Sequence, residues 1–306
     1  MLGLQYFSFA DLWSPLLLAA TLLLAAGYLV LIGPLAQRFT GSAEVPLRQR
    51  ALFLGGLLVL YLAQGGPVSL LGHILFSFHM VSMALSYLIA VPLMMLGIPD
   101  WCWRALVRVN PLRRLSFLAH PVVAALLFNG LFSLYHIPVI HDYVMLHFTV
   151  HRLYYAVLFV TSALMWWTLI NPLPEHRRAG GPVKIGFIFL NMVLLTPACG
   201  LIIFASAPLY ATYSDPGVWA RAMGYCVSGD PAALLQAFGG PGFFGGLSPK
   251  VDQQVGGIVM KFIQEFIFAS MLAYVFYHWY KKENGQDDPD LSGPSGELGD
   301  GALTRV

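Results

Sequence analysis

The sequence predicts an all-α integral membrane protein, a bundle of seven transmembrane helices with the N-terminus outside and the C-terminus in the cytoplasm. Composition indicates the membrane: 58% of the 306 residues are hydrophobic and only 10% are charged, whereas a soluble domain carries about 25% charged residues. The spacing of the apolar runs indicates the number of helices. The distribution of basic residues indicates their orientation.

Seven apolar runs are long enough to cross a bilayer, which requires about 20 residues. The second run is the weakest because Gly65, Gly66 and Pro67 interrupt it, so six spans are the alternative. The first run lacks a preceding basic segment, so we interpret it as a span and not as a cleaved signal peptide. The seven runs are at about 14–36, 51–71, 73–96, 117–136, 148–170, 184–206 and 255–279.

Basic residues concentrate on alternate connections between these runs, as the positive-inside rule requires for cytoplasmic segments. They include Arg38, Arg48, Arg50, Arg104, Arg108, Arg113, Arg114, Arg177, Arg178, Lys184, Lys281, Lys282 and Arg305. An odd number of spans agrees with termini on opposite sides. The net charge of +2 is too small to indicate a nucleic-acid partner, so membrane lipid is the expected surrounding.

The chain divides into a membrane domain, 1–282, and an acidic tail, 283–306, whose Gly, Pro and Ser content predicts disorder. A long outer loop at 207–253 lies within the membrane domain. Loops of this length are usually functional or disordered. Its aromatic residues are compatible with packing over the outer mouth of the bundle or with a tether at the interface.

Histidines cluster at the predicted outer end of the bundle, and imidazole is a good ligand for copper, iron and zinc. His147 and His151 are four residues apart, so they share a helix face and could chelate one ion. His79 and Met83 have the same spacing and form a soft pair that suits Cu(I). The six histidines at this end are His73, His79, His136, His141, His147 and His151.

Three further features complete the predicted metal region. His73 is expected on the same helix as His79, about 120° around the axis, so it need not share a ligand set. Asp252, at the lip of the last span, could serve as a ligand or accept a hydrogen bond from one. Of the three cysteines only Cys226 is predicted outside, which excludes a disulfide within the chain there.

Lys261 and Glu265 lie four residues apart near the middle of the last span, where charged side chains are costly. We expect the pair to face the protein interior, as a structural ion pair or as a functional site. Gly256 and Gly257 precede it and would permit close helix contact. Without a P-loop, dinucleotide fingerprint, GxSxG or HExxH pattern, the chain is not expected to be an enzyme.

Four sequence blocks resemble the multi-spanning CtaG family of cytochrome c oxidase assembly proteins. They are FADLWSP (Phe9 to Pro15), LFSFHMVSMALSYLIAVPLMMLGIP (Leu75 to Pro99), LFNGLFSLYHIPVIHDYVMLHFTVHRLYYAVLF (Leu127 to Phe159) and DQQVGGIVMKFIQE (Asp252 to Glu265). The resemblance implies a bacterial plasma-membrane protein needed to make active haem–copper oxidase, with oxidase subunits as partners and copper as cargo. The motif positions are His79, His136, His147, His151 and Asp252. Many members carry a second histidine where this chain has Met83.

The favoured hypothesis is an oxidase assembly factor that holds and delivers copper. Its predicted ligands are His79, Met83, His136, His147, His151 and Asp252, with His73 and His141 secondary. The alternative is a haem b-binding membrane oxidoreductase, with His79 and either His147 or His151 as axial ligands. Met83 suits Cu(I) better than a bis-imidazole haem. A transporter using Lys261 and Glu265 is a third hypothesis, which no inverted repeat supports.

Overall fold

The structure, a computed structural model, describes residues 3–109, 116–173, 180–227 and 230–284, and the regular elements within them are all helices. Six helical stretches are long and apolar enough to cross a membrane. A seventh candidate is a pair of helices, α9 (Pro121–Tyr135) and α10 (Pro138–Met145), which meet at a bend of 80°. The predicted helical bundle of six or seven spans is therefore confirmed.

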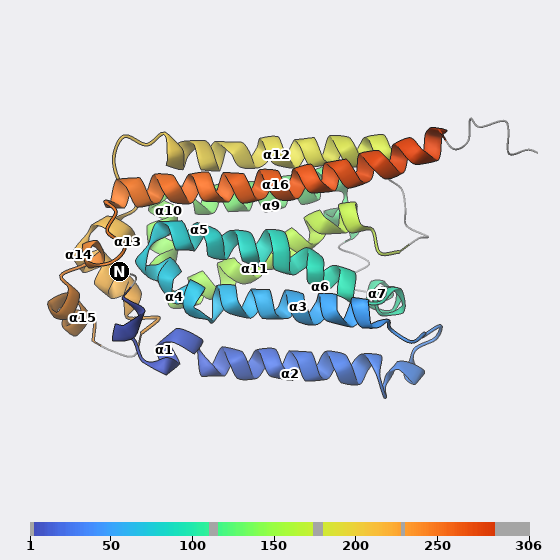
Figure 1. The fold of residues 1–306 in the computed structure, drawn as a ribbon, viewed down its shortest axis with the longest axis horizontal. Coiled ribbons are helices and arrows are strands. Elements are labelled where there is room, and N and C mark those ends of the chain that lie inside the picture. Colours follow the sequence, from blue (N-terminus) through green and yellow to red (C-terminus); the bar gives the residue numbers. More distant parts are fainter. Residues whose placement is uncertain (1–2, 110–115, 174–179, 228–229, 285–306) are drawn as a thin grey trace, which may run out of the picture.

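The spanning stretches run side by side along the length of the molecule (Figure 1). The chain starts at the end that carries the helices of the 207–253 segment, and the last described turn of α16 lies at the opposite end. The remaining spanning elements are α2 (Pro15–Ile32), preceded by α1 (Phe9–Trp13); α3 (Leu47–Gln64) with α4 (Pro67–Ile74); α5 (Phe76–Ala84), continued by η3 (Leu85–Ala90) and α6 (Val91–Gly97); α11 (Phe148–Ile170); α12 (Gly181–Ile203); and α16 (Pro249–Asn284).

The second span continues beyond its glycine break. Pro67 is the first residue of α4, a position where the missing N–H of proline costs no hydrogen bond. Leu75, with an extended backbone, then separates α4 from α5. The prediction that His73 and His79 share one helix is therefore wrong, because His73 ends α4 and His79 belongs to α5.

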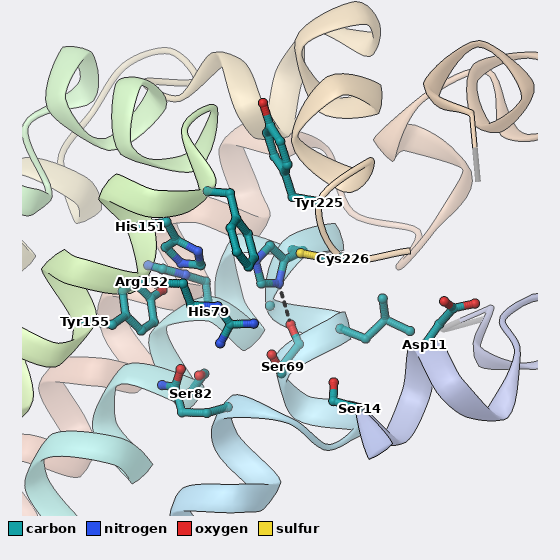
Figure 2. Close-up of a pocket in the computed structure, with 15 residues that line it drawn as sticks. Asp11, Ser14, Ser69, His79, Ser82, His151, Arg152, Tyr155, Tyr225 and Cys226 are labelled. Carbon is teal, nitrogen blue, oxygen red and sulfur yellow. Dashed lines mark hydrogen bonds between the residues drawn. The ribbon is translucent and has the colours of Figure 1, made fainter. Parts of the chain in front are cut away.

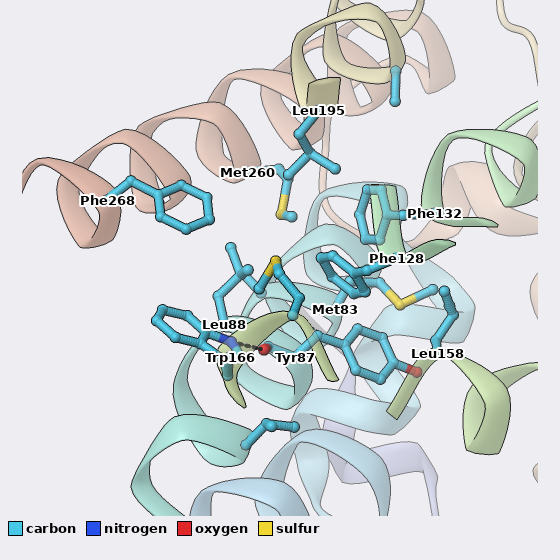
Figure 3. Packing of buried hydrophobic residues seen from close by; sticks show 14 of the residues in the cluster. Met83, Tyr87, Leu88, Phe128, Phe132, Leu158, Trp166, Leu195, Met260 and Phe268 are labelled. Carbon is cyan, nitrogen blue, oxygen red and sulfur yellow. Dashed lines mark hydrogen bonds between the residues drawn. The ribbon is translucent and has the colours of Figure 1, made fainter. Parts of the chain in front are cut away.

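A π-helical segment, η3, interrupts the third span just before Pro92. In a π turn, the amide of residue 92 would bond to the carbonyl of residue 87, but proline has no N–H. The carbonyl of Tyr87 instead accepts the Ser162 hydroxyl at 2.7 Å and the Trp166 indole N–H at 2.9 Å. The bond from Trp166 is visible in Figure 3. Two side chains of α11 thus stabilise the distorted span.

The main hydrophobic core lies between α5–α6 and the surrounding helices α9, α11, α12 and α16 (Figure 3). Phe128 and Phe132 of α9 and Phe268 of α16 are buried in it. Between α9 and α12, Asn129 donates a 2.7 Å hydrogen bond to the side-chain oxygen of Asn191. This bond joins two helices within the core.

The two predicted contact glycines bring α16 against its neighbours. A Cβ atom on Gly256 would lie 2.8 Å from Phe76 of α5, and one on Gly257 would lie 2.8 Å from Ile203 of α12. Neither site has room for a larger side chain without a shift. α16 therefore approaches α5 and α12 closely at this end, which places its first residues beside the start of α5.

The 207–253 segment is folded over one end of the bundle, called here the α14 end (Figure 1). Its buried Trp219 and Phe244 pack with Phe7, Leu70 and Ile74. The segment holds α13 (Ala211–Ser214), α14 (Pro216–Met223), α15 (Pro231–Phe238) and η6 (Pro241–Phe243). The remaining elements are η1 (Leu4–Tyr6), η2 (Ala36–Arg38), α7 (Asp100–Val107) and η4 (Ser116–Ala119).

Two predictions fall wholly or partly outside the described residues. Helix α16 continues to Asn284, two residues past the predicted domain limit, and the rest of the predicted tail, 285–306, is outside. So are five of the basic residues used to orient the chain: Arg113, Arg114, Arg177, Arg178 and Arg305.

Candidate functional site

Asp252, in the first turn of α16, caps the N-terminus of α5. Its Oδ2 accepts the backbone N–H of Phe76 at 2.7 Å and that of Ser77 at 3.3 Å, while Oδ1 accepts the Ser77 hydroxyl. The first amides of a helix lack partners within the helix, so a buried carboxylate stabilises that end. Both oxygens of this predicted ligand are thus occupied in holding the turn that precedes His79.

The two glutamines that follow Asp252 attach the segment after α12. Gln253 accepts the backbone N–H of Leu209 at 2.7 Å and donates to the carbonyl of Ile202 at 3.3 Å. Gln254 donates to the carbonyl of Ile203 at 3.0 Å. The Asp-Gln-Gln triplet therefore positions both α5 and the chain leading into α13.

A second carboxylate, Asp142 of α10, plays a similar part for α13. It accepts the backbone N–H groups of Ala211 at 2.9 Å and Thr212 at 3.1 Å, and the Thr212 hydroxyl at 2.8 Å. Its Oδ1 lies 3.6 Å from Nδ1 of His141. Asp142 thereby fixes α10 against α13 and orients the His141 ring.

Three histidines from three helices meet beneath these caps: His79 of α5, His136 after α9 and His141 of α10. His79 is 3% exposed, and the other two are fully buried. The ring centre of His79 lies 5.3 Å from that of His141 and 6.1 Å from that of His136. Two of these residues are among the predicted primary ligands, and His141 was predicted as secondary.

Tyrosines surround the three rings and fix the backbone near them. Tyr210 donates its hydroxyl to the carbonyl of His136 at 2.9 Å, and Tyr213 donates to the carbonyl of Gly72 at 2.6 Å. Burial raises the pKa of both hydroxyl groups well above the usual value, so both stay protonated donors at neutral pH. Their spacing in the sequence carried no signal of this role.

The Nε2 atoms of the three histidines are buried and have no hydrogen-bond partner among the described residues. Nδ1 of His136 lies 2.7 Å from the carbonyl of Phe132. A carbonyl oxygen only accepts, so Nδ1 carries the proton and Nε2 presents a free lone pair. An uncharged imidazole with a free, desolvated lone pair is suited to bind a metal ion.

A polar cavity of about 140 Å³ adjoins this cluster at His79 (Figure 2). His79 lines its inner part, so the cavity and the cluster share a residue. His151 also lines it, and its Nε2 is again buried without a partner. Other lining residues are Asp11, His73, Arg152, Tyr155 and Cys226. Sequence reasoning missed Cys226 because residues far apart in the chain form this wall.

Besides Asp252, two predicted ligands reach neither the cavity nor the cluster of three histidines. His147 is exposed, with Nδ1 bonded to the carbonyl of Tyr143 at 2.7 Å and its ring against the Tyr143 ring. Met83 is buried in the hydrophobic core near Phe128 (Figure 3). His147 is four residues from His151, and Met83 is four residues from His79. In neither pair do both side chains reach the cavity.

Lys261 and Glu265 form an ion pair on α16, and Lys261 also donates to the hydroxyl of Thr196 at 2.8 Å. Their side chains are 28% and 37% exposed, so the pair lies at the partly open boundary between α12 and α16. The predicted pair is therefore partly buried and faces α12, without being enclosed in the core. The buried polar residue of this stretch is Gln264, which donates to the carbonyl of Met192 at 3.3 Å.

Over the described residues, no three side chains of His, Cys, Asp or Glu are arranged to hold one metal ion together. The imidazoles instead stand in pairs around His79. The described residues thus present imidazole rings in pairs and not a complete set of metal ligands.

Comparison with known protein families identifies the family of this chain. The sequence pattern of the cytochrome c oxidase caa3 assembly factor family, Caa3_CtaG, matches residues 26–282. The chain belongs to this family. The resemblance drawn from the sequence blocks is thereby confirmed, although the block from Phe9 to Pro15 lies outside the matched residues. The curated proteins and the solved structures yielded no match.

Membership in the Caa3_CtaG family makes cytochrome c oxidase the partner of this chain. The matched region includes the cap formed by Asp252, the three buried histidines and most of the cavity wall. The apolar helices agree with a protein that crosses the membrane several times.

Proposed function

We propose that this Caa3_CtaG protein supports oxidase assembly by holding copper as Cu(I) and passing it to an oxidase subunit. The proposed ligands are the Nε2 atom of His79 and that of one neighbour, His141 or His136. The observation that carries the proposal is the burial of three unpartnered imidazole nitrogens in one cluster, whose member His79 lines a polar cavity. On the predicted orientation, the cavity opens on the outer face of a bacterial plasma membrane.

Free-energy considerations support a bound cation. Each buried polar group without a partner costs about 1–3 kcal/mol, so a chain that leaves three such nitrogens together gains from any ligand that engages them. The nearby carboxylates of Asp142 and Asp252 are occupied by backbone amides. A singly charged ion is therefore easier to bury here than a divalent one.

The chemistry of the donors favours copper over harder cations. Imidazole suits copper, zinc, iron and nickel, whereas magnesium and calcium prefer oxygen ligands. Cu(I) has a filled d shell and no preference for a complete octahedral or square arrangement, so a pair of imidazoles suits it. Ring-centre distances of 5.3 and 6.1 Å leave His79 in a position to share an ion with either neighbour.

The size of the cavity argues against the haem alternative. Pockets for cofactors and drug-sized ligands usually have volumes of about 300–1,000 Å³. The cavity beside His79 has a volume of about 140 Å³, which suits an ion and a few water molecules. His147, one of the two proposed partners of His79 in haem ligation, is exposed outside the cavity.

The proposal is tested by titrating the metal-free, detergent-purified protein with Cu(I) under anaerobic conditions against a chromophoric competitor. We expect tight binding that His79→Ala and His141→Ala each weaken by about tenfold or more. His147→Ala is the matched control and should bind as the unmodified chain does. An unmodified protein that binds no copper would refute the proposal.

A cellular assay links this binding to assembly. In a strain that lacks its own copy of this protein, the unmodified chain and His147→Ala should restore copper content and activity of caa3-type oxidase. His79→Ala should restore neither while reaching the same level in the membrane. Full restoration by His79→Ala would separate the assembly role from the histidine cluster.

A further inference from the structure

Cys226 lies in the wall of the cavity, on the chain segment that follows α14. Its backbone N–H bonds to the carbonyl of Met223 at 2.9 Å, and its thiol is partly buried. Figure 2 shows that Cys226, His79 and His151 line the same cavity. The thiol reaches this space only because the α14 segment folds back over α4.

Cys226 and His73 both line this cavity, and their side chains interact electrostatically. Nδ1 of His73 lies 2.8 Å from the carbonyl of Ser69, so this nitrogen carries the ring proton. Nε2 of His73 then carries the lone pair of the ring. A thiol and an imidazole lone pair thus belong to the wall of one polar cavity.

We propose that Cys226 Sγ and His73 Nε2 form a Cu(I) site at the mouth of the cavity, from which copper passes inward to the histidine cluster. The inference rests on the proposed function and adds its route. Thiolate ligands select Cu(I) among the metals that imidazole also binds. On binding, the S–H bond breaks, the S–Cu bond forms and the proton leaves to solvent, with no electron transferred.

A second observation independent of the cysteine supports a ligand in this cavity. His79 is 3% exposed, lines the cavity and presents an Nε2 without a partner among the described residues. A thiol at the mouth and a buried free nitrogen at the inner part are the two ends of one polar space. Along the cavity, from its mouth to its inner part, the proposed copper ligands therefore change from a sulfur–nitrogen pair to nitrogen atoms alone.

His151 bridges the two ends. Its ring centre is 5.6 Å from that of His73, and its Nε2 has no partner among the residues described. His79 follows as the next imidazole lining the cavity, 5.3 Å from His141. Copper can then move by exchanging one ligand at a time, without an intermediate step in which it is released to water.

The test compares Cu(I) stoichiometry and copper X-ray absorption for the unmodified chain, Cys226→Ser and Cys102→Ser. We expect about two Cu(I) ions per unmodified chain, with a sulfur ligand evident in the absorption spectrum. Cys226→Ser should bind about one ion fewer and lose the sulfur signal. Cys102→Ser, which changes a cysteine far from the cavity, is the matched control and should change neither.

His79→Ala separates the two proposals. It should lose the inner ion and keep the copper–sulfur signal of the site at Cys226. Copper bound only through nitrogen in the unmodified chain, with no effect of Cys226→Ser, would overturn this inference and leave the proposed function standing. Absence of copper from every variant would overturn both.

The route adds a kinetic expectation. In anaerobic stopped-flow experiments, Cys226→Ser should fill the histidine cluster at least about tenfold more slowly than the unmodified chain, at an unchanged final occupancy of that cluster. Equal filling rates would show that copper reaches the histidines without passing Cys226. The Cys102→Ser variant should fill at the unmodified rate.

Discussion

Asp252 and Phe76, 176 residues apart in the chain, are joined by a buried hydrogen bond of 2.7 Å between the carboxylate Oδ2 and the backbone N–H. The bond fixes the start of α5 against the start of α16. His79 follows within the next turn of α5, so its place at the inner part of the cavity depends on this cap.

We expect Asp252→Ala to lower the free energy of unfolding by about 3 kcal/mol, because it leaves the amides of Phe76 and Ser77 without an acceptor. Denaturant unfolding in detergent micelles measures the change. Asp215→Ala, which removes an exposed cap from α14, is the control and should cost about 1 kcal/mol. Equal losses in the two variants would contradict the special role of Asp252.

Replacing His79 by leucine should separate stability from metal binding. The unmodified, metal-free chain buries an unpartnered nitrogen there, so His79→Leu should be at least as stable without metal. A saturating Cu(I) concentration of 100 times Kd should stabilise the unmodified chain by about 2.7 kcal/mol and have a smaller effect on the variant. Thermal unfolding with and without Cu(I) measures both, and identical metal-induced shifts would count against His79 as a ligand.

The carbonyl of Tyr87 provides a test of the π-helical segment. Trp166→Phe and Ser162→Ala each remove one of its two donors, and we expect each to cost about 1 kcal/mol. The double variant should cost more than the sum, because the buried carbonyl then has neither donor. A double-mutant cycle of unfolding free energies measures the coupling, and strict additivity would show that the two bonds act independently.

Cys102, in α7 at the end opposite the cavity, should react slowly with maleimides at neutral pH. Burial, and then the negative charge of Asp100, raise the pKa of the Cys102 thiol to about 11. Only the thiolate reacts, so labelling in a Cys226→Ser background should speed up about tenfold per pH unit up to that pKa. Asp100→Asn should accelerate labelling at neutral pH. A rate at pH 7 equal to that of a free thiol would contradict the raised pKa.

Sequence reasoning located the spanning helices because hydropathy is a property of consecutive residues. The interruption at Gly65–Pro67 weakens the second predicted span, which runs to residue 71, and the third predicted span begins at residue 73. Whether a helix resumes after a break depends on what packs beside it, and here Gly72 of α4 lies against the backbone of His79. The assignment of His73 to the wrong helix followed from that missing contact.

By itself, the sequence determined a membrane bundle, membership in an oxidase assembly family and a set of histidines at one end of the chain's helices. Only the tertiary structure decided which of them matter together. It joined His141 to His79, directed His147 to the surface, occupied Asp252 with a helix cap and placed Cys226 in the same cavity wall as His73. Residue types and local periodicity can be read from neighbouring positions in the sequence. Whether a histidine nitrogen or a carboxylate oxygen keeps a free lone pair depends on which distant groups already bond to it.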